Sequence, residues 1–128
     1  MFHDHLTKLL KELKVEGVES LSREMSTISL ELDGTLITIS DAPPGIEISA
    51  NLGTVPEAEN YEPLYTKLLR GNLLGQATMR ASLGLSEEGS NVLISSVVPT
   101  VRSYREFHDA VEDFVNAVSF WKEEIQTV

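Results

Sequence analysis

The sequence predicts an α+β fold in which helices pack on an antiparallel sheet, with the elements in the order α-β-β-β-α-β-β-α. Three observations support this prediction. Helical apolar patterns open and close the chain, over residues 2–14 and 103–125. Five runs between them have the two-residue period of half-buried strands. A leucine-rich segment with helical spacing, residues 60–74, separates the first three runs from the last two.

The first helix is amphipathic, because its apolar residues share one side while its lysines lie away from that side. We expect Gly17 to end this helix, since glycine commonly follows the last helical turn. The apolar side consists of Phe2, Leu6, Leu9, Leu10 and Leu13.

The first three strands are expected to form a meander. Residues 27–33 alternate strictly, and Asp33-Gly34 suits a two-residue hairpin turn into residues 35–40. The prolines of residues 41–45 are expected to end that ladder, and a third alternating run follows over residues 46–52. In the second strand Leu36 faces one way and Ile37 the other. Neither face is plainly polar, so a helix of the same chain or a partner is expected to cover the outer one.

The leucine-rich segment is predicted to be a helix that Asn60 caps, with Pro63 in its first turn, where a missing N–H costs little. Its apolar residues spread over about 180°, wider than the roughly 100° stripe that one buried face requires. We therefore expect two separate surfaces to cover this helix. These apolar residues are Leu64, Tyr65, Leu68, Leu69 and Leu73.

The last two strands, residues 80–85 and 91–98, are predicted to form a hairpin around a polar turn that contains Gly89. Pro99 ends the second of them, and Ser103 with Glu106 forms a capping box for the final helix. The apolar stripe of that helix consists of Tyr104, Phe107, Val111, Phe114, Val115, Val118, Trp121 and Ile125.

Length and charge restrict the classes of function. The 128 residues suit one domain, residues 1–128, with an independent core. The net charge of −10 disfavours nucleic acid and anionic membranes, because both are negatively charged. The sequence has no cysteine and no apolar run near the roughly 18 residues of a spanning helix. We expect a soluble cytoplasmic protein that is not inserted in a membrane.

The sequence contains no constellation typical of an enzyme. The cluster of His3, Asp4 and His5 lacks a helical ligand spacing, which favours a solvated N-terminal turn over a metal site. His108 and Glu112 share one face of the last helix, where they form either an acid–base pair or, as we favour, a common surface pair. We therefore predict no enzymatic activity, no cofactor and no metal.

In its element order the chain resembles the class I type III secretion chaperones, the CesT and SycE-like family. The resemblance spans nearly the whole chain and is strongest in the segment Leu-Leu-Arg-Gly-Asn-Leu-Leu of residues 68–74. The other segments that carry it are Leu9-Leu10 with Leu13, residues 28–34, residues 48–53, residues 81–85, and Phe114, Val115 and Trp121.

The resemblance implies a homodimer in the bacterial cytoplasm that binds the N-terminal chaperone-binding segment of a secreted effector without nucleotide. A second chaperone and the secretion ATPase are further implied partners. An alternative is a regulatory or adaptor module that binds a folded partner. If the chain is such a chaperone, the expected effector-binding residues are the exposed parts of Phe2, Leu6, Leu10, Ile37, Ile39 and Ile48. The expected dimer contacts are Tyr65, Leu69, Leu73, Leu74 and Leu83.

Overall fold

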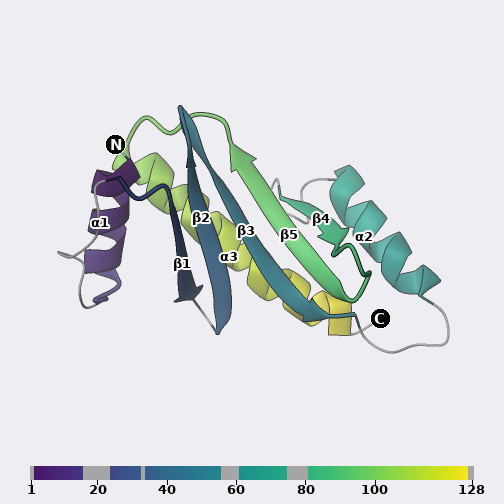
Figure 1. Cartoon of the computed structure of the whole chain (residues 1–128). Helices are drawn as coiled ribbons and strands as arrows, with labels where there is room; N and C mark the ends of the chain where they lie inside the picture. The colour runs from purple at the N-terminus through teal and green to yellow at the C-terminus, as the bar shows by residue number, and fades with distance from the viewer. Residues whose placement is uncertain (1, 16–23, 33, 56–60, 75–80, 127–128) are drawn as a thin grey trace.

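A computed structural model describes residues 2–15, 24–32, 34–55, 61–74 and 81–126, with only the backbone for residues 71–74. Its eight elements confirm the predicted α+β order (Figure 1). The helices are α1 (Phe2–Glu12), α2 (Glu62–Leu74) and α3 (Tyr104–Gln126), and the strands are β1 (Thr27–Leu32), β2 (Thr35–Ala42), β3 (Gly45–Thr54), β4 (Ser82–Leu85) and β5 (Asn91–Val98).

The five strands form one antiparallel sheet in the order β1-β2-β3-β5-β4. The predicted meander and the predicted β4–β5 hairpin are both present. The sequence pattern did not place β5 beside β3, which makes β1 and β4 the two edges. The long helix α3 crosses one face of the sheet, α1 lies beside β1, and α2 lies beyond β4 (Figure 1).

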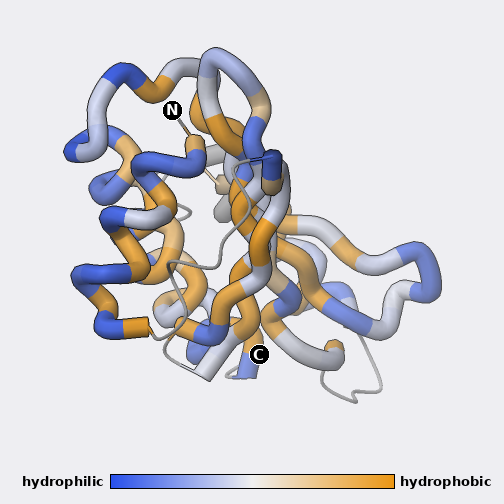
Figure 2. The backbone as a smooth tube through the Cα atoms, turned by 60° about the vertical axis from the view of Figure 1, so that its left-hand side comes forward, coloured by the Kyte–Doolittle hydropathy of each residue, from blue (hydrophilic) through white to orange (hydrophobic). Residues whose placement is uncertain are grey.

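One face of the sheet packs against the helices and the other does not. Ile37, Ile39 and Ile48 are completely buried on the inner face, and Phe107 of α3 is buried with them. The outer face carries mainly small hydroxyl side chains. One row of them crosses all five strands in register: Ser29, Thr38, Ser49, Ser95 and Ser82. Hydrophobic residues concentrate along the strands and the inner sides of the helices, with hydrophilic ones at the loop tips (Figure 2).

Helix α1 ends at Glu12, earlier than the sequence indicated. Lys14 adopts a positive φ of 58°, and its amide donates to the carbonyl of Lys11. The amide of Val15 donates to the carbonyl of Leu10. These two bonds are the Schellman pattern that closes a helix. A lysine therefore holds the left-handed position that we expected of Gly17, which lies outside the described residues.

The ladder of β2 and β3 continues further than predicted, because Ala42 still pairs with Gly45. Because Ala42 pairs with Gly45, Pro43 and Pro44 form the tight turn between these strands, and the bond between them is cis. Gly45 is required here, since a Cβ atom at this position would overlap the backbone of Val98 and Pro99.

The start of α3 confirms the Ser103 half of its predicted capping box. The Ser103 hydroxyl accepts a hydrogen bond from the Glu106 amide at 3.2 Å. The predicted stripe is buried or half-buried along the whole helix, and Ala117 is buried within it as well. At the far end the Lys122 ammonium donates to the Thr35 hydroxyl at 2.7 Å, which ties α3 to the start of β2.

Candidate functional site

Strand β1 has an open side. It pairs only with β2, and no other described strand lies on its far side. The two-residue turn makes Leu32 and Thr35 a hydrogen-bonded pair, and the Asp41 amide donates to the Ser26 carbonyl at 2.7 Å. In these two pairs the residues of the β1 segment, Leu32 and Ser26, both have even numbers, so the even-numbered residues direct their backbone groups toward β2. By the alternation of an antiparallel ladder, the N–H and C=O groups of Thr27, Ser29 and Glu31 point to the open side.

A groove adjoins the end of β1. Leu32 forms one wall of it, Leu9 and Leu13 of α1 form another, and α3 supplies the rest. We call it the edge groove; its volume is about 250 Å³ and its residues are Leu9, Leu13, Leu32, His108, Val111, Glu112 and Val115. Leu13 is 44% exposed although it is apolar, so the groove offers an uncovered apolar surface beside free backbone groups.

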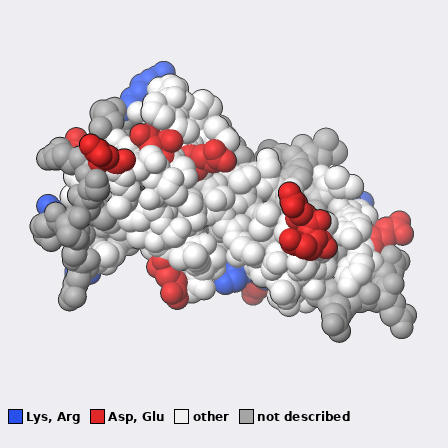
Figure 3. Space-filling view, viewed as in Figure 1, with Lys and Arg blue, Asp and Glu red and all other residues white. Residues whose placement is uncertain are grey.

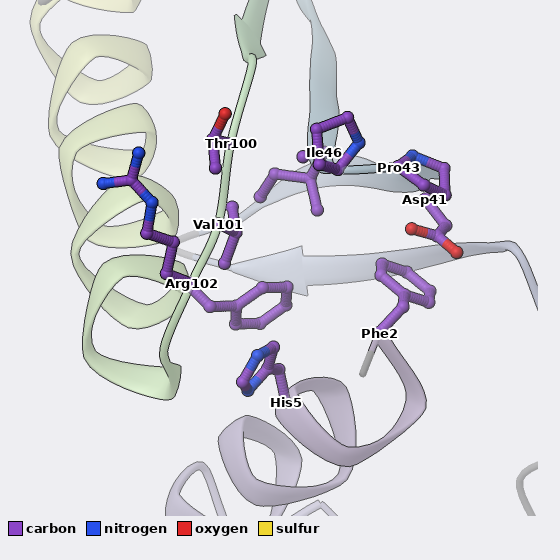
Figure 4. Close-up of a pocket in the computed structure, with 11 residues that line it drawn as sticks. Phe2, His5, Asp41, Pro43, Ile46, Thr100, Val101 and Arg102 are labelled. Carbon is purple, nitrogen blue, oxygen red and sulfur yellow. The ribbon is translucent and has the colours of Figure 1, made fainter.

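A larger cavity of about 620 Å³ lies at the other end of α1. Phe2 and His5 of α1 line it, facing Ile46 and Val101 from the β2–β3 turn region and the segment before α3 (Figure 4). We call it the turn pocket; its remaining residues are Asp41, Pro43, Pro44, Gly45, Thr100, Arg102 and Phe107. The pocket is mainly apolar and aromatic, with charged groups of both signs among its lining residues.

Aromatic contacts hold α1 against α3 beside this pocket. Phe2 meets Phe107 edge-on with ring centroids 6.3 Å apart, and His5 stacks on Phe107 at 5.6 Å. Burial lowers the pKa of His5 below its ordinary value of 6.5, so the imidazole is neutral at pH 7. Burial, together with the Glu12 carboxylate, raises the pKa of Tyr104 to about 12. The His5 and Tyr104 side chains at the junction of the two helices are therefore both neutral at pH 7.

The residues predicted to contact an effector need a correction. All six are buried in the core, with exposures of 7% or less, so the expectation that they have exposed parts is wrong for this protomer. The alternating pattern of β2 and β3 predicted which residues share a face but not which face is covered. In the structure α3 covers the face that carries the isoleucines. Phe2 alone of the six lines one of the two cavities. The residues in question are Phe2, Leu6, Leu10, Ile37, Ile39 and Ile48.

The predicted dimer contacts divide into three groups. Tyr65 and Leu69 of α2 are 44% and 68% exposed, whereas Leu83 of β4 is buried at 7%. Leu73 and Leu74 lie on α2, and their side chains fall outside the described residues. Leu64 and Leu68 on the other side of α2 are buried. Helix α2 therefore has an apolar face turned inward and a second apolar face turned outward.

The candidate chemical residues form surface pairs. The Nε2 atom of His108 lies 3.8 Å from the Glu112 carboxylate, and its Nδ1 atom lies 3.2 Å from Asp109. His3 lies 3.7 Å from Asp4. Within the described part of the chain, no three His, Cys, Asp or Glu side chains gather in a way that could hold a metal ion.

Sequence reasoning missed most of the edge groove. Leu13 was assigned to the buried stripe of α1, but α1 ends before it and leaves it at the rim. Val111 and Val115 were assigned to the stripe of α3, and both also line the groove. The signal that could have revealed the groove was the width of the apolar stripe of α3. A helix that packs against both a sheet and a second helix has a wide apolar stripe, and a groove lies between its two packing partners.

The fold and the surface together define a small α+β protein with an open edge strand and an apolar groove beside it. The chain belongs to the Tir chaperone protein (CesT) family, whose model matches residues 5–122. The resemblance to type III secretion chaperones is thus confirmed at the level of the family. No described helix is both long and apolar enough to cross a membrane.

The chain is also similar to known proteins in sequence and in fold. The Chlamydia pneumoniae protein CPj0713/CpB0740 is 32% identical over 106 residues, which cover 75% of this chain and 81% of that protein. The ExsC–ExsE complex contains a chain with a TM-score of 0.74 at 15% identity, covering 95% of this chain and 91% of its own. The HopA1–SchA chaperone–effector complex contains one with a TM-score of 0.69 at 14% identity, covering 99% and 94%. At these identities the solved structures establish the shared fold.

Proposed function

We propose that this protein is a non-enzymatic cytoplasmic chaperone that binds the N-terminal segment of a secreted effector and keeps it soluble and competent for type III secretion. Membership of the Tir chaperone protein family supports the proposal. Two of the solved structures with the same fold are complexes described as a chaperone with an effector and as ExoT with SpcS from Pseudomonas aeruginosa. The latter has a TM-score of 0.62 at 18% identity and covers 92% of this chain and 94% of its own.

The observation that carries the proposal is the unprotected edge of β1. Proteins usually protect an exposed edge with charged residues, especially lysine, with proline or with a bulge, because free N–H and C=O groups pair with other chains. Strand β1 has the sequence TISLEL; Glu31 is its one charged residue, it contains neither lysine nor proline, and its register with β2 is regular. An extended segment of an unfolded effector can therefore add to the sheet as a sixth strand.

The two cavities give this strand addition its selectivity. Backbone hydrogen bonds to β1 are independent of sequence, whereas apolar side chains of the effector enter the edge groove beside Leu13 and Leu32. The turn pocket, lined by Phe2 and Val101, accepts a further apolar or aromatic side chain. The buried residues Leu6, Leu10 and Ile37 support these surfaces from beneath rather than contacting the effector.

We further propose that the protein is a homodimer paired through the outer face of α2. Tyr61 and Tyr65 stack at that face with centroids 6.2 Å apart, and Leu69 follows one turn later. A stacked aromatic pair beside an exposed leucine is the composition typical of an interface core. With a charge of −10 on each copy, a mainly apolar contact is also where two copies repel each other least.

Ser29→Pro tests the strand addition, because it removes one outward N–H while Ser29 does not use its own N–H toward β2. The N-terminal segment of a secreted protein that co-elutes from the native host is expressed alone and titrated into the chaperone. We expect affinity to fall at least about tenfold, since one backbone bond is lost and the proline ring obstructs its neighbours.

Ser29→Ala is the matched control, because it keeps the N–H and removes only the hydroxyl. Circular dichroism should show the same fold for both variants. Equal affinity of the proline variant and the native protein would exclude β1 as the site of effector binding.

A further inference from the structure

The side chains that border the open side of β1 include one charged group. Strand β1 turns Thr27, Ser29 and Glu31 to the outer face of the sheet. Glu31 is exposed, and its direct neighbour on β2 is Leu36, which is itself 61% exposed. Among the described residues, Glu31 forms no ion pair. Its carboxylate is therefore available to a group that binds beside it.

The strand residues of the outer face offer Glu31 no cation. None of the five strands contains lysine or arginine, and among their residues on this face the one other carboxylate is Glu47 of β3. Figure 3 shows a broad uncharged surface in the middle of the molecule, with Asp and Glu side chains gathered at separate places around it. Glu31 thus marks one end of an otherwise neutral edge.

The ladder geometry fixes which residue of an added strand meets Glu31. Because Glu31 directs its N–H and C=O outward, the residue opposite forms a hydrogen-bonded pair with it, and that residue's side chain lies on the same outer face. The residues before and after it point to the inner side, where the edge groove begins at Leu32. In the sequence of the ligand, the residue opposite Glu31 is therefore the direct neighbour of a residue whose apolar side chain enters the edge groove.

We propose that Glu31 selects effector segments that carry a lysine or arginine between two apolar residues, with the cation opposite Glu31 and one apolar side chain in the edge groove. This inference rests on the proposed strand addition to β1. An opposite-charge pair across two strands favours binding, whereas a carboxylate at the same position of the ligand is repelled. Glu31 is then a specificity residue, and the backbone of β1 supplies the affinity.

The test uses three synthetic strand peptides of alternating valine and threonine that differ only at one outward threonine position, which holds lysine, glutamine or glutamate. Fluorescence anisotropy measures their affinities at low salt and at 150 mM salt. We expect the native protein to bind the lysine peptide about two- to fivefold more tightly than the glutamine peptide, and the glutamate peptide more weakly than both. The preference should decrease at the higher salt concentration.

Charge reversal gives the decisive comparison. Glu31→Lys should shift the preference toward the glutamate peptide, and Glu31→Gln should lose most of the lysine preference, because only the screened charge of the rest of the protein then distinguishes the peptides. Glu47→Gln removes the other carboxylate of the same face away from the edge, and it should keep the native order. Equal binding of all three peptides to the native protein, lost in Ser29→Pro, would overturn the role of Glu31 but leave the chaperone proposal standing. Failure of every peptide to bind would contradict strand addition and this inference together.

Discussion

The two ends of the sheet leave different kinds of surface uncovered. At the β1 end, α1 buries its apolar residues, and what no other described strand pairs with is the backbone of the edge strand, with a groove beside it. At the β4 end, the edge strand is only four residues long, and what remains free is the apolar outer face of α2. A free backbone suits an extended partner of variable sequence, whereas a fixed apolar side-chain surface suits a second folded copy.

The largest effect on stability is expected for a substitution in the core, because both ends of the sheet depend on that core. Ile37→Asp places a carboxylate at a position with no exposed surface, so it should destabilise the fold by at least about 4 kcal/mol and remove both surfaces. Leu36→Asp changes the adjacent residue, which is 61% exposed on the opposite face. That variant should remain folded, and a urea titration followed by circular dichroism compares the two. Similar midpoints for both would show that α3 does not cover the inner face as described.

A smaller effect is expected for a substitution at the β4 end that changes the oligomeric state and leaves the β1 end intact. Leu69→Asp should abolish the proposed dimer while leaving the protomer folded, because a carboxylate in an apolar interface costs several kcal/mol unless it is paired. Sedimentation velocity measures the change of mass, with Leu36→Asp as the control for an exposed leucine outside α2. An unchanged dimer in Leu69→Asp would place the dimer contact elsewhere than the outer face of α2.

The smallest effect concerns the β1 end. The folded state prefers neutral His5, because burial lowers its pKa below the ordinary value of 6.5. The unfolded chain therefore takes up the proton first as the pH falls below about 6.5, and stability decreases there. Denaturant midpoints at pH 7.5 and 5.5 should show that His5→Gln loses part of this decrease. If the native protein and His5→Gln respond equally to pH, His5 contributes nothing to the dependence.

The sequence alone determined the local elements. The alternation of residues 27–32, the turn before Thr35 and the cap at Ser103 depend on residues close together in the chain, and all three lie where predicted. The two-sided character of α2 was also readable, because the spread of its leucines exceeded a single buried face. The family followed from the order of these elements.

Only the tertiary structure decided which face of each element is covered. Ile37 and Leu36 are neighbours with similar side chains, yet one is fully buried and the other largely exposed, because α3 packs on one side of β2 from a distant part of the sequence. The edge groove arises for the same reason, since Leu13, Leu32 and Val111 come from three separate elements. A pattern fixes which residues share a face, but the burial of that face depends on where the remaining chain packs.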